Sequence, residues 1–160
     1  MLASLTMFKH IVLILSVIVA ANSTELPSKK YLNLSAIKTM VAAAEAEAQR
    51  QNVEVTICVV DESGNLLFLE KADSAPLNTI TWAQKKARHA AFYKSPSKDA
   101  ADTIKKGSVE ALAFPDFFPN QGGVPIIVDG QIVGGISASG AKSEIDEAIA
   151  RAGLNALLKK

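Results

Sequence analysis

Residues 53–70 read VEVTICVVDESGNLLFLE, and this stretch decides the fold. Val53–Val60 is rich in β-branched residues and places every second side chain on one face, so it predicts a strand. Asp61–Asn65 predicts a turn in which Gly64 supplies a positive φ angle. Leu66–Glu70 then predicts the returning strand. The whole stretch is expected to form an antiparallel hairpin.

A second hairpin is predicted near the C-terminus. Val124–Val128 and Gln131–Ile136 both favour strands, and the Asp129-Gly130 pair between them is typical of a two-residue type I′ turn. The preceding residues, 114–123 (FPDFFPNQGG), hold two prolines and two glycines around three phenylalanines. We expect an irregular loop there.

Helices are predicted around the two hairpins. Apolar residues recur at three- and four-residue spacing after Asn33, which can cap a helix that Asn52 ends. Leu77–Lys94 follows Pro76, a residue suited to the start of a helix. One face of this second helix carries small or aliphatic side chains that suit close packing on a sheet: Ile80, Ala83, Ala87 and Ala90.

Two more helices complete the pattern. Ser97 can cap a helix that runs through Lys106. Ser143 can cap a last helix to about Leu158, with Asp146 at the reciprocal capping position. The order is hairpin, helices, hairpin, helix. It predicts an α+β fold, an antiparallel sheet flanked by helices and not a doubly wound parallel one.

Length and charge narrow the class of protein. The 160 residues suffice for one domain with a proper core. The 17 basic and 16 acidic residues are interspersed, which excludes the basic face that nucleic-acid binding needs. The single cysteine, Cys58, excludes an intrachain disulfide. Its place in a predicted strand favours a buried, inert thiol.

Residues 1–21 differ in kind from the rest of the chain. A basic end precedes the uncharged run Ile11–Ala21, which is shorter than the ~20 residues that a membrane-spanning helix needs. The pattern predicts a signal peptide, hence a secreted or periplasmic protein with no stable membrane span after cleavage. An uncleaved N-terminal anchor is the alternative. We expect an arm over residues 22–33 and one domain over residues 34–160.

Several kinds of chemistry lack the residues they need. One histidine and one cysteine beyond the predicted signal peptide are too few for a His/Cys zinc site, and no GxSxG motif is present to expose a nucleophilic serine. Residues 135–143 (GISASGAKS) nearly form a phosphate-binding loop, but one residue too many precedes Lys142, and the segment belongs to a hairpin strand without the βαβ setting that a nucleotide site needs. The helix start at Ser143 can still attract an anion such as a carboxylate.

One face of the second helix carries the most informative residues. Spacings of four, three and four residues place Trp82, Lys86, His89 and Tyr93 together. An imidazole between aromatic rings suits a flat aromatic ligand, with His89 as an axial ligand to iron. The alternative is that a neighbouring helix or another subunit packs on this face and His89 is merely hydrogen-bonded.

Two further groups can contribute to such a site. Lys86 and Arg88 belong to a small basic cluster that can pair with haem propionates, although most such clusters are solvated faces. Phe114, Phe117 and Phe118 can line a pocket mouth or simply anchor their loop to the core.

Several segments resemble the GlcG/HbpS family of haem-binding proteins, which is itself similar to the C-terminal domain of PduO-type corrinoid adenosyltransferases. The resemblance covers nearly all of residues 34–158. Its motifs are residues 59–65 (VVDESGN), 70–73 (EKAD), 86–90 (KARHA), 122–130 (GGVPIIVDG) and 134–153. The chain departs from the family pattern at Lys71, where arginine is usual, at His89, where threonine is usual, and at Ser137-Ala138, where Gly-Val is typical.

The resemblance implies a profilin-like antiparallel sheet of about five strands, flanked by helices on both faces, and a homo-oligomer. It also implies haem as the ligand, with a corrinoid as the less favoured choice. The expected function is haem sequestration or sensing without catalysis of its own. The alternatives are an accessory subunit or enzyme acting on a small hydroxy acid or diol product, and a partner of a sensor or transporter. The expected haem-contacting residues are His89, Trp82, Lys86, Tyr93, Arg88 and Phe117, with His89 on the metal.

Overall fold

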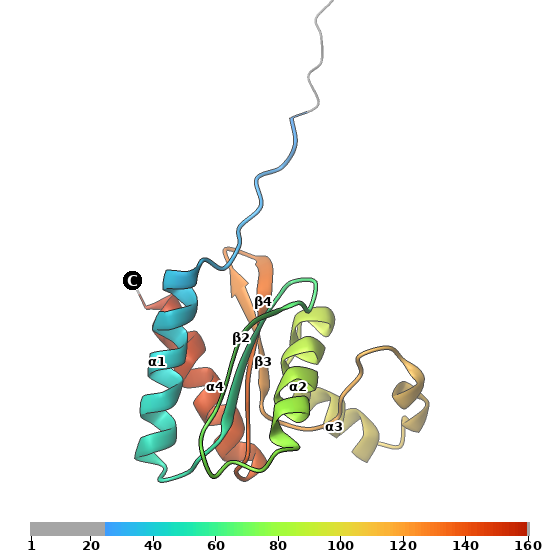
Figure 1. Ribbon diagram of the computed structural model, residues 1–160. Coiled ribbons are helices and arrows are strands. Elements are labelled where there is room, and N and C mark those ends of the chain that lie inside the picture. The colour runs from blue at the N-terminus through green and yellow to red at the C-terminus, as the bar shows by residue number, and fades with distance from the viewer. Residues whose placement is uncertain (1–24, 160) are drawn as a thin grey trace, which may run out of the picture.

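The computed structural model describes residues 25–159 and forms one four-stranded antiparallel sheet with helices on both faces (Figure 1). The predicted signal peptide and the first residues of the predicted arm lie outside the described residues. The strand order is β2-β1-β4-β3. The strands are β1 (Thr56–Asp61), β2 (Leu66–Lys71), β3 (Gly123–Val128) and β4 (Gln131–Ser139).

The expectation of about five strands is wrong, because the described residues supply four. Both hairpins form where the sequence predicts them. The segment between α3 (Ser97–Lys105) and the second hairpin contains Pro115 and Pro119. Proline has no N–H group to donate to a strand ladder, so this segment does not add a strand. It forms the short 3-10 helix η1 (Val109–Ala113) and an irregular loop.

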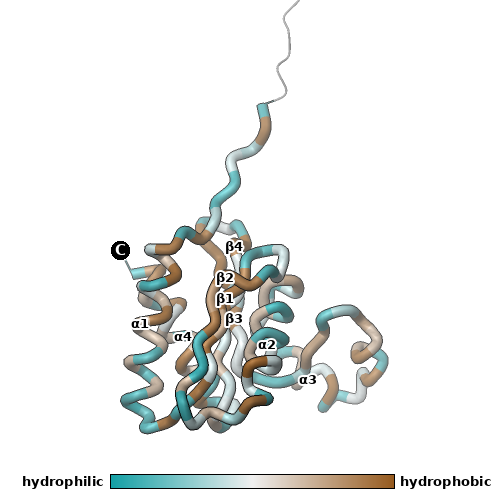
Figure 2. Tube along the Cα trace, viewed as in Figure 1, coloured by the Kyte–Doolittle hydropathy of each residue, from teal (hydrophilic) through white to brown (hydrophobic). Residues whose placement is uncertain are grey.

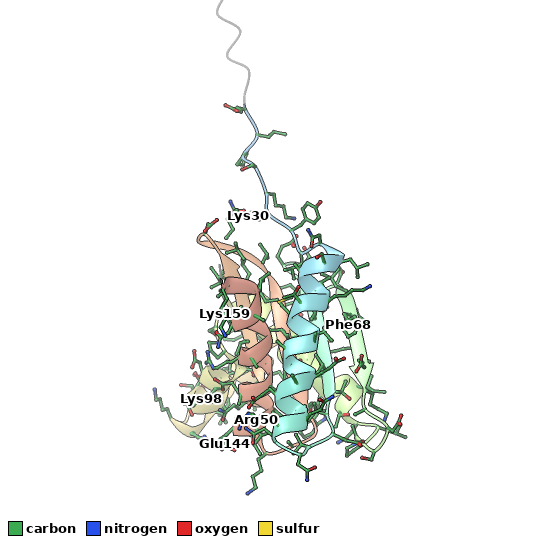
Figure 3. All side chains as sticks on the ribbon, turned by 90° about the vertical axis from the view of Figure 1, so that its left-hand side faces the viewer. Lys30, Arg50, Phe68, Lys98, Glu144 and Lys159 are labelled. Atoms are coloured by element: carbon green, nitrogen blue, oxygen red, sulfur yellow. The ribbon has the colours of Figure 1, made fainter. Side chains whose placement is uncertain are left out.

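Two helices cover one face of the sheet and one covers the other. The first face carries α1 (Leu34–Arg50) and α4 (Ser143–Leu158), which pack closely on one another. They run antiparallel, since Arg50 and Glu144 lie at the same end (Figure 3). The opposite face carries α2 (Thr79–Tyr93), and α3 (Ser97–Lys105) projects to the side beyond it.

The alternation of β1 explains the two-sided core. Ile57 and Val59 point into the large apolar cluster beneath α1 and α4, whereas Cys58 and Val60 point to the alanines of α2. Figure 2 shows the consequence, with mostly hydrophobic strands between helices whose outward turns are hydrophilic. This burial of both faces fits the helix positions that the sequence predicts.

The α2 helix lies unusually close to the sheet because glycines face it. A Cβ atom at Gly135 would collide with the backbone carbonyl of Ala87, and one at Gly123 would collide with that of Lys86. The small side chains of α2 permit the same approach from the other side. Glycine in β3 and β4 therefore sets the distance between helix and sheet.

The turns and caps follow local chemistry. Asn33 accepts the Ala36 N–H at 2.8 Å and caps α1, as predicted. Asp129 and Gly130 have φ angles of 48° and 77°, which confirms the type I′ turn. Ser143, however, is the first residue of α4 and does not cap it.

Two lysines of the described part of the arm contact the turns of the two hairpins. Lys29 pairs with Glu62, and Lys30 pairs with Asp129. The Lys30 N–H also donates to Gln131 Oε1 at 3.1 Å. Among residues 25–159, no helix has the length and apolar character required to cross a membrane.

Candidate functional site

The outer face of α2 is covered by residues 114–120, which we call the covering loop. Beneath it the His89 ring stacks on Tyr93, with ring centroids 4.6 Å apart and an angle of 14° between planes. Phe117 meets both rings edge-on, at 5.4 Å from His89 and 5.6 Å from Tyr93. Three of the predicted site residues are therefore in mutual contact.

His89 is 1% exposed, and its two ring nitrogens have different surroundings. Nδ1 accepts the Phe118 N–H at 3.1 Å, so the proton of the neutral ring lies on Nε2. Nε2 has no hydrogen-bond partner among the described residues. A buried polar atom left unpaired costs about 1–3 kcal/mol, which calls for a compensating role.

Burial lowers the pKa of His89 below its ordinary value of 6.5, because the charged ring is poorly solvated there. The Asp116 backbone and the negative charge of Asp99 both favour the protonated ring and raise the pKa, but burial has the larger effect. Around neutral pH His89 is therefore the neutral imidazole, which is the form that binds metals.

Three hydrogen-bonded anchors hold the covering loop on α2. The Tyr93 hydroxyl donates to the Pro115 carbonyl at 2.8 Å. Arg88 forms a bidentate pair with Asp116, at 2.8 and 3.1 Å, and also donates to the Gly64 carbonyl. The third anchor is the Phe118 N–H on His89. These polar contacts can open without loss of the sheet core.

Trp82 lies farther along the same face of α2. It meets the Phe118 ring edge-on at 6.0 Å and remains 42% exposed. Lys85 Nζ lies 5.6 Å from the centre of the same Phe118 ring. A hollow of about 190 Å³ lies at the surface of this region, lined by Lys85, Asp116, Phe117 and Phe118.

Lys86 does not join these residues, contrary to the prediction from helical spacing. It is 1% exposed, and its Nζ donates to Asp146 at 2.8 Å and to the Ala138 carbonyl at 3.2 Å. Position 86 lies between the outer face of α2 and the face that packs on the sheet. Its long side chain follows the sheet, because a buried carboxylate there compensates the charge.

Arg88 lies closer to the expectation, but its present partner is Asp116 and not a ligand. Cys58 is fully buried against the alanines of α2, so it does not reach the outer face of that helix. Burial raises the pKa of its thiol to about 12, so the thiolate that metals need does not form near neutral pH.

Whether a haem fits can be judged from His89 itself. The unpaired Nε2 and the surrounding rings suit an axial ligand in an aromatic pocket. With the Phe118 N–H on Nδ1, however, the lone pair that iron requires is not on Nε2. The residues present fit a haem iron once the covering loop moves and the ring proton lies on Nδ1, because the lone pair then lies on Nε2.

Sequence reasoning missed two partners that matter here. Asp116 anchors the covering loop and has a φ angle of 56°, a conformation that is uncommon for a residue other than glycine. Asp146 was assigned a capping role, and it does accept the Ala141 N–H at 3.0 Å. Its pairing with Lys86, 60 positions earlier, has no signal in a single sequence.

Comparison with known proteins agrees with the fold. The model of the family described as haem-degrading protein HbpS-like matches residues 32–155. Protein GlcG of Escherichia coli is 33% identical over 112 residues, which cover 70% of this chain and 84% of that protein.

Two solved structures share the fold at recognisable identity. The crystal structure of HbpS has a TM-score of 0.77 and 31% identity, and the match covers 89% of this chain and 100% of that one. The crystal structure of a PduOC:haem complex has a TM-score of 0.73 and 26% identity, over 79% of this chain and 95% of that one. The latter holds haem on a chain of the same architecture.

Proposed function

The chain belongs to the family of HbpS-like haem-degrading proteins, and on this premise we propose that it binds haem on the outer face of α2, with His89 as an axial ligand. One observation carries the proposal: a buried imidazole whose Nε2 has no partner among the described residues, set between the rings of Tyr93 and Phe117. A haem iron would satisfy this nitrogen once the ring proton has moved to Nδ1.

Binding requires the covering loop to move. The hollow of about 190 Å³ at Phe117 and Phe118 is smaller than the roughly 300–1,000 Å³ of pockets that hold drug-sized ligands. Removing Phe117 from the His89 ring would open this hollow toward His89 and Tyr93. The loop movement also breaks the Phe118 bond to Nδ1, so that Nδ1 can hold the proton and Nε2 the lone pair.

The charges released by this movement suit haem carboxylates. Arg88 loses its pairing with Asp116 when the loop leaves, and Lys85 already lies at the rim of the hollow. A guanidinium and an ammonium at one edge, with apolar rings beyond, match the propionates and the macrocycle respectively. When bound, haem supplies an iron centre. The chain supplies orientation, exclusion of water and a neutral ligand.

We further propose that the protein is secreted or periplasmic and that it sequesters or senses haem as the homo-oligomer that the resemblance implies. Support for export comes from the pattern of residues 1–21. Fractionation of cells with an antibody tests the location, and retention in the cytoplasm would contradict it.

Titration of the purified protein with hemin tests the binding proposal. We expect a shifted Soret band that saturates at one hemin per chain. His89→Ala should weaken binding and change the spectrum, and added imidazole should restore the wild-type band, because it can occupy the vacated ligand position. A wild-type protein without a shift at micromolar hemin, or a variant with an unchanged spectrum, would overturn the assignment.

A further inference from the structure

A second hollow lies between the first turns of α2 and α4. Figure 1 shows that these two helices begin at the same end of the sheet. We call it the α4 pocket. Its volume is about 200 Å³, roughly that of six water molecules in the liquid. It is walled by Trp82 and Asn120, and Ser139, Ser143 and Asp146 line it as well. The site has room for a small molecule only.

The start of α4 presents free backbone donors to this pocket. No side chain caps the helix. The N–H groups of Ile145 and Asp146 donate to the Lys142 carbonyl, each at 2.9 Å. The N–H groups of Ser143 and Glu144 make no hydrogen bond with the residues that the structure describes. Two such donors at a helix N-terminus favour an anion.

An independent observation comes from β4. Ser139 is 2% exposed, and its hydroxyl makes no hydrogen bond within the described part of the chain. Ser137, two residues earlier, donates to the Ala83 carbonyl of α2 at 2.6 Å, so strand alternation turns Ser139 to the same side, where the pocket lies. The Ser139 side chain is nearly buried, but its unpaired hydroxyl oxygen is not fully enclosed and opens on the pocket, where a ligand can accept its hydrogen bond.

The charges around the pocket allow an anion to enter. Asp146 is the one acidic residue among those lining it, and Lys86 neutralises its charge at 2.8 Å. The other oxygen of Asp146 accepts the Ala141 N–H. The start of α2 adds a second helix N-terminus, where Asn78 also forms no side-chain cap. The electrostatic field of both helices therefore favours negative charge here.

From these observations we propose that the α4 pocket binds a small carboxylate, held by the N–H groups of Ser143 and Glu144 and by the hydroxyl of Ser139. The proposal does not depend on haem binding at His89. A carboxylate can reach the pocket from two sources, a free small acid or the propionate of a larger ligand that lies over Trp82. Both present the same group to the same donors.

Nuclear magnetic resonance tests the free-acid source. Sodium acetate should shift the backbone amide signals of Ser143 and Glu144, whereas acetamide, its neutral analogue, should not. Ser139→Ala should weaken acetate binding about tenfold, since it removes a hydrogen bond to a charged group. Ser35→Ala, at an exposed serine, is the matched control and should bind like the wild type.

A second pair of variants isolates the backbone donor. Ser143→Pro removes one N–H at a helix position that tolerates proline, and Lys142, with ψ of 145°, already has the conformation that precedes proline. Ser143→Ala keeps the N–H. We expect loss of acetate binding in the proline variant alone, with unchanged circular dichroism in both.

Hemin and its dimethyl ester distinguish the propionate source. If acetate does not bind, the proposal requires that Ser143→Pro weakens hemin binding and leaves the dimethyl ester unaffected. Acetate binding that the variants abolish supports the free acid. Two outcomes overturn the proposal. In one, acetate does not bind and Ser143→Pro changes the binding of hemin and of its dimethyl ester equally. In the other, acetate binds equally well to the wild type and to every variant.

Discussion

The ammonium group of Lys86 and the carboxylate of Asp146 form an ion pair at 2.8 Å in the interior of the protein. The Ala138 carbonyl accepts a further hydrogen bond from the ammonium at 3.2 Å. Both side chains are almost fully buried. Burial lowers the pKa of Lys86 and raises the pKa of Asp146. The charge of Asp146 raises the pKa of Lys86 again, and the charge of Lys86 lowers that of Asp146. The pair therefore stays ionised only because both members are present.

A double-mutant cycle tests this interdependence. Lys86→Met should cost about 3–5 kcal/mol in the free energy of unfolding, because it leaves a carboxylate buried without its counter-charge. Asp146→Asn keeps an acceptor for the Ala141 N–H but leaves the ammonium group of Lys86 buried without a counter-charge. The double variant should lose much less than the sum of the two single losses, as measured by urea denaturation. Additive losses would show that the two groups act independently.

The histidine at position 89 makes the stability of the protein depend on pH. Its pKa is below 6.5 in the folded state, so the unfolded chain binds a proton that the folded chain does not. Stability is therefore fully present above pH 6.5 and falls as the pH drops from there toward the folded-state pKa. The slope reaches at most about 1.4 kcal/mol per pH unit.

Urea denaturation at several pH values between 7.5 and 5 measures this slope. His89→Phe keeps a ring in the aromatic cluster but cannot titrate, so its stability should fall less steeply than that of the wild type. The comparison uses the slope of stability against pH and not the absolute stability. His89→Phe also loses the acceptor for the Phe118 N–H, which lowers the stability at every pH. Parallel pH curves for the two proteins would contradict the assignment.

Among the elements, the two hairpins were predictable from the sequence. The irregular character of the covering loop was predictable as well, but its path over α2 was not. Alternation in residues 53–70 and the Asp129-Gly130 turn each act locally, so one sequence suffices to place them. The contact of Phe117 with His89 joins residues 28 positions apart through a loop without periodicity. The expected fifth strand came from the resemblance, and no described segment outside the two hairpins forms one.

The site residues divide in the same way. Helical spacing correctly brings His89 and Tyr93 together, because both project from one face of α2. It cannot show that Phe118 donates to His89 or that Asp116 pairs with Arg88. These contacts depend on how the chain crosses the molecule, and local propensity does not specify that path.

The anchoring of the covering loop leads to a prediction about rate. Tyr93→Phe removes the hydroxyl that donates to the Pro115 carbonyl and keeps the ring on His89. One lost hydrogen bond of about 1 kcal/mol should raise the population of the open loop and speed hemin association roughly fivefold. Stopped-flow absorbance measures the rate. An unchanged rate would mean that the loop need not open at this point.

Close packing of α2 on β4 gives a second test among the elements. Gly135→Ala introduces a methyl group that meets the Ala87 carbonyl, a backbone atom that cannot turn aside. We expect a loss of about 3 kcal/mol in the free energy of unfolding. Gly107→Ala is the control, because nothing lies within 4 Å of its Cβ and only its φ angle of 98° opposes a side chain. Its loss should be nearer 1 kcal/mol.

On the scale of the whole molecule, three different parts of α2 take part in packing and in the two proposed sites. Its inner face packs on β1 and β4, its outer face carries His89 beneath the covering loop, and its start borders the α4 pocket. Because α1 and α4 secure the other face of the sheet, loop movement on α2 need not disturb the large core (Figure 1). The proposed haem site is formed by side chains on a packed helix, so it exists only in the folded protein. We therefore expect haem to bind the folded state alone.

Thermodynamic linkage turns that expectation into a measurement. A ligand that binds only the folded protein raises the free energy of unfolding by about 2.7 kcal/mol when its free concentration is a hundred times Kd. Hemin should therefore move the urea midpoint of the wild type upward at pH 7.5. The gain should shrink at pH 5, where a proton competes for the His89 ring, and in His89→Ala at either pH. A midpoint that hemin leaves unchanged, or raises equally in the wild type and the variant, would place any bound haem away from α2.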